Sequence, residues 1–116
     1  MSPVTANDTL SDAQYHALAF ELLARIEAQA DRWLQDGVVD IDSARTGGLL
    51  ELSFPNGSKI VVNTQPPLHE MWLAAKSGGL HFRYVGAAWR DTKSGEEFVA
   101  ALSRTASEQA GQSLSF

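Results

Sequence analysis

The Asn-Gly pair at positions 56 and 57 constrains the fold more than any other local feature of the sequence. It separates two short runs rich in apolar residues, 49–54 and 59–63. A two-residue type I′ turn needs a positive φ at both central positions, and Asn-Gly meets that need well. The two runs are therefore predicted to pair as an antiparallel hairpin, which places a β-sheet in the middle of the chain.

Further strands are predicted on both sides of this hairpin. Upstream, a strand is expected over residues 38–43, with Asp40 and Asp42 on one face and apolar residues on the other. Downstream of Pro66-Pro67, the predicted strands cover residues 68–75, 80–85 and 89–90. Glycines between these runs predict turns, so the strands should follow one another as hairpins.

Two amphipathic helices enclose the strands along the sequence. Apolar side chains recur at helical spacing over residues 11–33, and Ser11 with a glutamine three residues on predicts a capping box. A second helix is predicted over residues 94–110, with Ser94 and a glutamate three residues on as its capping box. This order indicates an α+β two-layer sandwich, with both helices on one face of an antiparallel sheet. The other face is then left to solvent.

The length and composition predict a small soluble protein. The 116 residues fit a single domain over 1–116, in which residues 1–10 are expected to be flexible. The sequence has no cysteine, so a metal could be held only by oxygen or imidazole ligands. We recognise neither a signal or transit peptide nor an apolar run of about 20 residues. The expectation is a cytoplasmic protein without a membrane partner.

Charge is distributed unevenly along the chain. Residues 1–51 carry nine acids against three arginines, a net charge of −6, whereas residues 52–116 carry five acids against six lysines or arginines, a net charge of +1. An acidic half repels phosphate backbones, so we expect no nucleic-acid partner. It favours cations or a basic protein surface instead.

Several motifs resemble the signature of the frataxin family. The central ones are Asn56-Gly57-Ser58-Lys59-Ile60-Val61-Val62-Asn63, Gln65, Pro67 and Glu70-Met71-Trp72-Leu73-Ala74. The later ones are Gly78-Gly79-Leu80-His81-Phe82, Trp89 and Ser94-Gly95-Glu96-Glu97-Phe98. The closing Glu108-Gln109-Ala110-Gly111 with Ser115-Phe116 resembles the bacterial (CyaY) branch. The resemblance extends from about Gln14 to the C-terminus.

This resemblance implies weak binding of iron, as Fe²⁺ or Fe³⁺, along an acidic ridge. Carried over residue by residue, the ridge comprises Glu27, Asp31, Asp36, Asp40, Asp42 and Glu51. Hard cations such as Fe³⁺ prefer carboxylate oxygens, and exposed carboxylates can bind them without a preformed cage. His16 is a further candidate, since some family members use an N-terminal histidine as an extra ligand.

The resemblance also implies docking on a cysteine desulfurase and on the scaffold protein of iron–sulfur cluster assembly. Its partner-binding residues map to Trp72, Asn63 and Gln65. In the predicted strand 68–75, Trp72 falls on the opposite face from Met71 and Leu73. If those two pack under the helices, Trp72 points to solvent, where an aromatic is a common interface anchor. A buried core tryptophan is the alternative.

The predicted function is an iron-binding regulator of cluster assembly, or an iron donor to it, rather than an enzyme. The ridge is thinner than in relatives, with Ala28, Ala30 and Arg32 among its acids and Pro55 before the Asn-Gly turn. This departure leaves room for a second hypothesis, an acidic protein-interaction module with no physiological metal. A third is ferroxidase-like oxidation of iron at the ridge. The protein is expected to be a monomer, with iron-driven oligomers as the alternative.

Overall fold

The computed structural model describes residues 10–116. Helix α2 (Asp12–Gln35) comes first and helix α3 (Phe98–Ala110) comes last. Between them lie β1 (Asp42–Thr46), β2 (Leu49–Ser53), β3 (Lys59–Gln65), the 3-10 turn η1 (Pro66–Leu68), β4 (Glu70–Ala75), β5 (Gly78–Val85) and β6 (Ala88–Asp91). The flexibility expected for residues 1–10 concerns a segment outside the described residues, apart from Leu10, which packs partly buried against the core.

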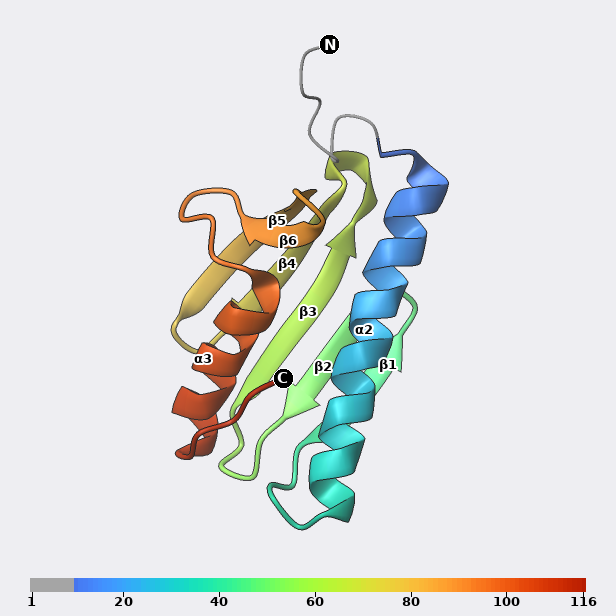
Figure 1. Ribbon diagram of the computed structural model, residues 1–116. Coiled ribbons are helices and arrows are strands. Elements are labelled where there is room, and N and C mark those ends of the chain that lie inside the picture. The colour runs from blue at the N-terminus through green and yellow to red at the C-terminus, as the bar shows by residue number, and fades with distance from the viewer. Residues whose placement is uncertain (1–9) are drawn as a thin grey trace.

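The six strands form one antiparallel sheet in the order of the sequence, β1-β2-β3-β4-β5-β6. Both helices lie on the same face of this sheet (Figure 1). The predicted α+β two-layer sandwich is therefore confirmed. None of the helices in residues 10–116 is long and apolar enough to cross a membrane.

The core lies between the helices and the inner face of the sheet. Alternate strand residues point inward and the helices contribute residues at helical spacing, as the two periodicities require. The largest fully buried side chains are Tyr15, Phe82, Phe98, Leu23, Ile26, Ile41, Leu50, Leu52, Ile60, Met71, Leu73 and Leu102. The C-terminal tail completes this layer, because the Phe116 ring packs edge-on against Trp33 at 4.7 Å.

The capping box predicted for the first helix is present. The Ser11 hydroxyl accepts a hydrogen bond from the Gln14 backbone N–H at 3.1 Å, and the Gln14 side chain accepts one from the Ser11 backbone N–H at 2.9 Å. Such a cap contributes about 1 kcal/mol to helix stability, because it satisfies N–H groups that have no partner inside the helix. It fixes where α2 begins.

The capping box predicted for the second helix is wrong. The Ser94 hydroxyl accepts from the nearby Glu96 backbone N–H instead, and α3 begins only at Phe98. The preceding loop is held by Asp91, whose carboxylate accepts from the Lys93 and Ser94 backbone N–H groups. Hydrogen bonds of this local kind compete with helix formation, and here they delay it.

Two predicted strand starts are also wrong. The first strand begins at Asp42 rather than Val38, although the alternation persists through the preceding loop, where Ile41 is buried. The strand predicted from Leu68 begins at Glu70. Prolines at the start of η1 favour the 3-10 turn, which ends at His69 in a left-handed conformation with φ of 52°.

Helix α2 anchors the connection between β3 and β4. The Tyr15 hydroxyl donates to the Glu70 carbonyl at 2.6 Å and accepts from the Gln65 backbone N–H at 3.0 Å. His69 stacks on the Tyr15 ring at 4.8 Å, and its Nε2 lies 2.7 Å from Asp12 Oδ1. The first turns of the helix therefore hold both ends of this connection, which borders the outer face of the sheet.

Candidate functional site

Four of the predicted ridge carboxylates are exposed at the end of α2, in the segment that follows it and at the first residue of β1. They are Asp31, Asp36, Asp40 and Asp42. Within the described part of the chain, none of their side chains makes an ion pair or hydrogen bond. Unpaired carboxylates in water keep their full capacity to bind cations, and they also repel one another.

The other two ridge carboxylates are paired with cations. Glu27 Oε1 lies 2.9 Å from Arg45 Nη1, which reaches it from β1. Glu51 Oε1 lies 3.0 Å from Lys59 Nζ across the β2–β3 hairpin. A metal ion at Glu27 or Glu51 would therefore compete with a cation that the protein itself supplies.

The predicted ligands do not converge on one point. In residues 10–116, no three Asp, Glu or His side chains are close enough together to hold a metal ion between them. The acidic edge, defined here as Glu27, Asp31, Asp36, Asp40 and Asp42, is a region of negative potential without a preformed cage. Such an arrangement suits weakly bound hard cations that keep most of their water ligands.

His16 lies apart from the acidic edge. It is exposed in the first half of α2, with its ring 5.3 Å from Tyr15 and 6.1 Å from Phe20. Eleven residues separate it from Glu27, which is roughly 16 Å along a helix. It borders an open hollow with Asp12 and His69 instead. The structure therefore does not bring His16 together with the other predicted ligands.

The three predicted partner-binding residues lie together on the outer face of the sheet. Asn63 is directly opposite Trp72 across the β3–β4 pair, and Gln65 is opposite Glu70. Trp72 is half-buried on this face, whereas Met71 and Leu73 are fully buried on the inner face. The outward orientation predicted for Trp72 is confirmed.

Glu70 organises the side chains around Trp72, and the sequence analysis missed this role. Its Oε1 accepts a hydrogen bond from Trp72 Nε1 at 2.8 Å, and its Oε2 lies 3.5 Å from Arg83 Nε. His81 stacks on the Trp72 indole, with ring centroids 4.1 Å apart and planes 5° apart. The only signal in the sequence was that Glu70 and Trp72 share one face of a strand. The register with β5 places Arg83 opposite Glu70 and His81 opposite Trp72.

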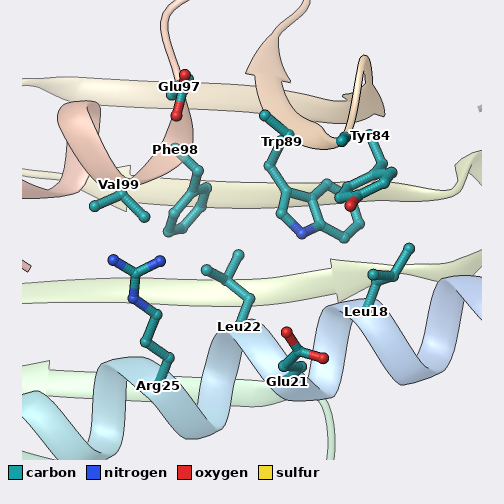
Figure 2. A pocket seen from close by; sticks show the side chains of 11 residues that line it. Leu18, Glu21, Leu22, Arg25, Tyr84, Trp89, Glu97, Phe98 and Val99 are labelled. Atoms are coloured by element: carbon teal, nitrogen blue, oxygen red, sulfur yellow. The ribbon is translucent and has the colours of Figure 1, made fainter. Parts of the chain in front are cut away.

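A separate groove lies on the helix side of the molecule (Figure 2). Its volume is about 260 Å³, and Leu18, Leu22, Trp89 and Phe98 form its apolar walls. Glu21 and Glu97 lie on opposite sides of it in Figure 2. None of the predicted site residues lines this groove.

A family model described as a frataxin-like domain matches residues 8–112. The chain belongs to the frataxin family. The resemblance identified in the sequence is therefore confirmed, and it spans both the acidic edge and the Trp72 face.

The frataxin-like chain has relatives with matching length. The iron-sulfur cluster assembly protein CyaY of Burkholderia mallei (strain SAVP1) is 51% identical over 107 residues, which cover 92% of this chain and 98% of the relative. The protein of the same name from Variovorax paradoxus (strain S110) is 53% identical over 107 residues, covering 92% and 97% of the two chains.

Solved frataxin structures share the fold. The frataxin of Psychromonas ingrahamii, solved as a model for stability in the CyaY family, matches with a TM-score of 0.80 at 33% identity, covering 91% of this chain and 97% of that one. A trimeric frataxin from the yeast Saccharomyces cerevisiae, described as complexed with ferrous iron, has a TM-score of 0.67 at 23% identity and covers 81% and 86%. At that identity the yeast protein supports the fold alone.

Proposed function

We propose that this chain takes part in iron–sulfur cluster assembly as an iron-binding protein, acting as a regulator of the cysteine desulfurase–scaffold complex or as its iron donor. The relatives of matching length are named for cluster assembly. The observation that carries the iron-binding part is the set of four exposed carboxylates on the acidic edge that have no partner among the described residues.

In this proposal the acidic edge and the Trp72 face have different roles. The acidic edge attracts iron and a basic surface of the desulfurase over long range, because unscreened charge acts up to about 8–10 Å at physiological salt. The Trp72 face supplies the short-range anchor, since a half-exposed aromatic held in place by Glu70 and His81 loses little entropy on docking. The role is non-enzymatic, cytoplasmic and assigned to the monomer.

A second candidate function is an acidic interaction module that binds no metal in the cell. The pairing of Glu27 with Arg45 and the lack of a three-ligand cluster in residues 10–116 favour it. The Trp72 face would then be the main functional surface.

An iron titration distinguishes the two candidates. Under anaerobic conditions Fe²⁺ should shift or broaden the amide signals of Glu27, Asp31, Asp40 and Asp42 at micromolar or weaker affinity. The Asp40→Asn/Asp42→Asn double variant should weaken this response. The matched control, Glu97→Gln/Glu108→Gln, removes the same charge from the α3 region and should leave the response to Fe²⁺ unchanged.

A desulfurase assay with and without iron then tests the regulatory role. Iron should change cysteine turnover only when the wild-type chain is present, and less so with the Asp40→Asn/Asp42→Asn variant. If iron perturbs α3 rather than the acidic edge, or leaves all amides unmoved, the iron-binding proposal fails and the interaction module remains. Oxygen consumption with Fe²⁺ at a catalytic rate would instead favour a ferroxidase.

A further inference from the structure

Two arginines are directly opposed on the outer face of the sheet. Arg83 of β5 and Arg90 of β6 are Cα partners in the antiparallel register. Their neighbours Phe82 and Trp89 point inward and are buried, so both arginines project outward. Like charges directly opposite each other on a sheet destabilise it. Here each arginine also contacts a glutamate, Arg83 with Glu70 and Arg90 with Glu97, which offsets part of this repulsion.

Both guanidinium groups are only loosely held. Arg83 lies 3.5 Å from Glu70 and 3.4 Å from the Leu68 carbonyl. Arg90 lies 3.5 Å from Glu97 and 3.2 Å from the Gly95 carbonyl. These contacts are longer than the 2.9 Å of Arg45 with Glu27. Each guanidinium carries more N–H donors than its contacts use, and about half of each side chain is exposed (47% and 42%).

The arginines border an open hollow of about 530 Å³ at the β5–β6 edge. Glu70 and Asp91 also line it, but both are recessed: the Glu70 side chain is 13% exposed and Asp91 is 8% exposed. Both carboxylates already accept hydrogen bonds: Glu70 from the Trp72 indole, and Asp91 from two backbone N–H groups. The most exposed charged groups of the hollow are therefore the two guanidinium groups, although the formal charges of its four charged residues cancel.

This arginine pair adjoins the Trp72 face. Glu70 contacts both Trp72 and Arg83, so one carboxylate positions the aromatic and the cation side by side. Arginine and tryptophan together are typical of protein-interface centres. The planar guanidinium fork also matches a carboxylate with two parallel hydrogen bonds, which a lysine could not form.

We propose that Arg83 and Arg90 bind carboxylate side chains from an acidic segment of the partner protein that docks on Trp72. This inference rests on the proposed function for the identity of the partner. The two surfaces would then bind groups of opposite charge, carboxylates at the two arginines and cations or a basic surface at the acidic edge, and so orient the chain between its partners.

A peptide titration tests the carboxylate recognition by itself. The probe is the acetylated and amidated peptide Glu-Glu-Leu-Glu-Glu, with Gln-Gln-Leu-Gln-Gln as its uncharged match, added to labelled protein. The acidic peptide should shift the side-chain Nε signals of Arg83 and Arg90, and the uncharged one should not. The Arg83→Gln/Arg90→Gln variant should lose the response. The control variant Arg32→Gln/Arg104→Gln, with the same net charge, should keep it.

Equal shifts with both peptides, or shifts centred on other arginines, would overturn the assignment. So would tighter binding of a duplex RNA than of the acidic peptide. Self-association through the same face, seen as a mass that rises with concentration in light scattering and falls in the Arg83→Gln/Arg90→Gln variant, would replace the partner with a second copy and also overturn it.

Partner binding tests the inference in context. Affinity for the scaffold should fall about tenfold in Arg83→Gln/Arg90→Gln and lose part of its salt dependence, with less than about a twofold change in Arg32→Gln/Arg104→Gln. The melting temperature of Arg90→Gln should equal or exceed that of the wild type. A lower one would assign Arg90 to the fold and count against the proposal.

The two proposals fail differently. If Trp72→Ala weakens binding and the double arginine variant does not, this inference falls and the proposed function stands. If the wild-type chain binds neither partner, the proposed function falls, and the peptide titration still decides whether the hollow recognises carboxylates.

Discussion

Arg45 of β1 neutralises Glu27 of α2 through a contact of 2.9 Å between Nη1 and Oε1. The same guanidinium lies 4.8 Å from the centre of the Phe20 ring. The pair joins the helix to the edge strand, and it places a positive charge inside the acidic edge. Arg45 therefore contributes to packing and opposes cation binding at the same place.

We predict that Arg45→Gln strengthens metal binding at the acidic edge. Removing a unit charge about 4 Å from a divalent cation in water is worth about 2 kcal/mol, or about 30-fold in affinity. Titration with Co²⁺ or Mn²⁺, followed by amide shifts of Glu27 and Asp31, measures the change. The stability loss should stay within about 1 kcal/mol, as for other partly exposed ion pairs.

Arg32→Gln provides the matched control for this experiment. Arg32 lies on α2, the helix that carries Glu27. It is exposed, and among the described residues its side chain bonds only to Gln29. It should change metal affinity less than Arg45→Gln does. Equal effects of the two variants would mean that only net charge matters and that Glu27 is not a metal ligand.

Salt and divalent cations should raise the melting temperature. Asp36, Asp40 and Asp42 have no cationic partner in residues 10–116, so screening relieves their mutual repulsion. The increase should be smaller in Asp40→Asn/Asp42→Asn, which should also melt higher than the wild type at low salt. A wild-type melting temperature that stays flat as salt rises to about 0.15 M would refute repulsion at this edge.

Trp72→Ala should separate binding from folding. Because the indole is half-buried on the outer face, we expect a loss of about 1 kcal/mol in the free energy of unfolding, with faster dissociation of the partner complex. Trp89→Ala is the counterpart inside the core, where the side chain is 7% exposed, and should cost about 3–5 kcal/mol. Surface plasmon resonance and urea denaturation measure the two effects. A folded Trp72→Ala that binds at full strength would exclude an anchoring role.

Tyr15 should make stability depend on pH in the alkaline range. Burial raises the pKa of its phenol above the usual value of about 10, although the hydrogen bond from Gln65 opposes this. The folded chain then holds the phenolic proton more tightly than the unfolded chain does. This contribution is complete below about pH 10 and is lost as the pH rises through the raised folded pKa.

Tyr15→Phe isolates this effect. The variant lacks the hydroxyl that bonds Gln65 and Glu70, so it should lose about 1–2 kcal/mol at pH 7. The difference in the free energy of unfolding between wild type and variant should shrink as the pH rises above about 10. Urea denaturation at neutral and alkaline pH provides the measurement. A difference that stays constant with pH would show that the Tyr15 phenol has the same pKa in the folded and unfolded chains.

Local features of the fold were predictable because they depend on contacts between residues close in sequence. The Ser11–Gln14 capping box, the hairpin around Asn56-Gly57 and the alternation that turns Trp72 outward each follow from a few neighbouring residues. The two-residue type I′ turn predicted for Asn56-Gly57 is wrong: only Gly57 has a positive φ (87°), and residues 54–58 connect the paired strands, with the Gly57 N–H donating to the Phe54 carbonyl. The predictions failed at boundaries where other local bonds competed, as Asp91 does before α3 and as the prolines of η1 do before β4.

The sandwich, the family and the faces on which the acids and Trp72 lie could all be predicted from the sequence, since periodicity and motifs are properties of the chain. The pairing of charged residues, in contrast, depends on how the elements pack. Glu27 and Arg45 are 18 residues apart, and packing of α2 on β1 brings them together. Arg83 and Arg90 oppose each other, and Glu70 reaches Arg83, because of the strand register, which depends on how every inward side chain packs beneath the helices.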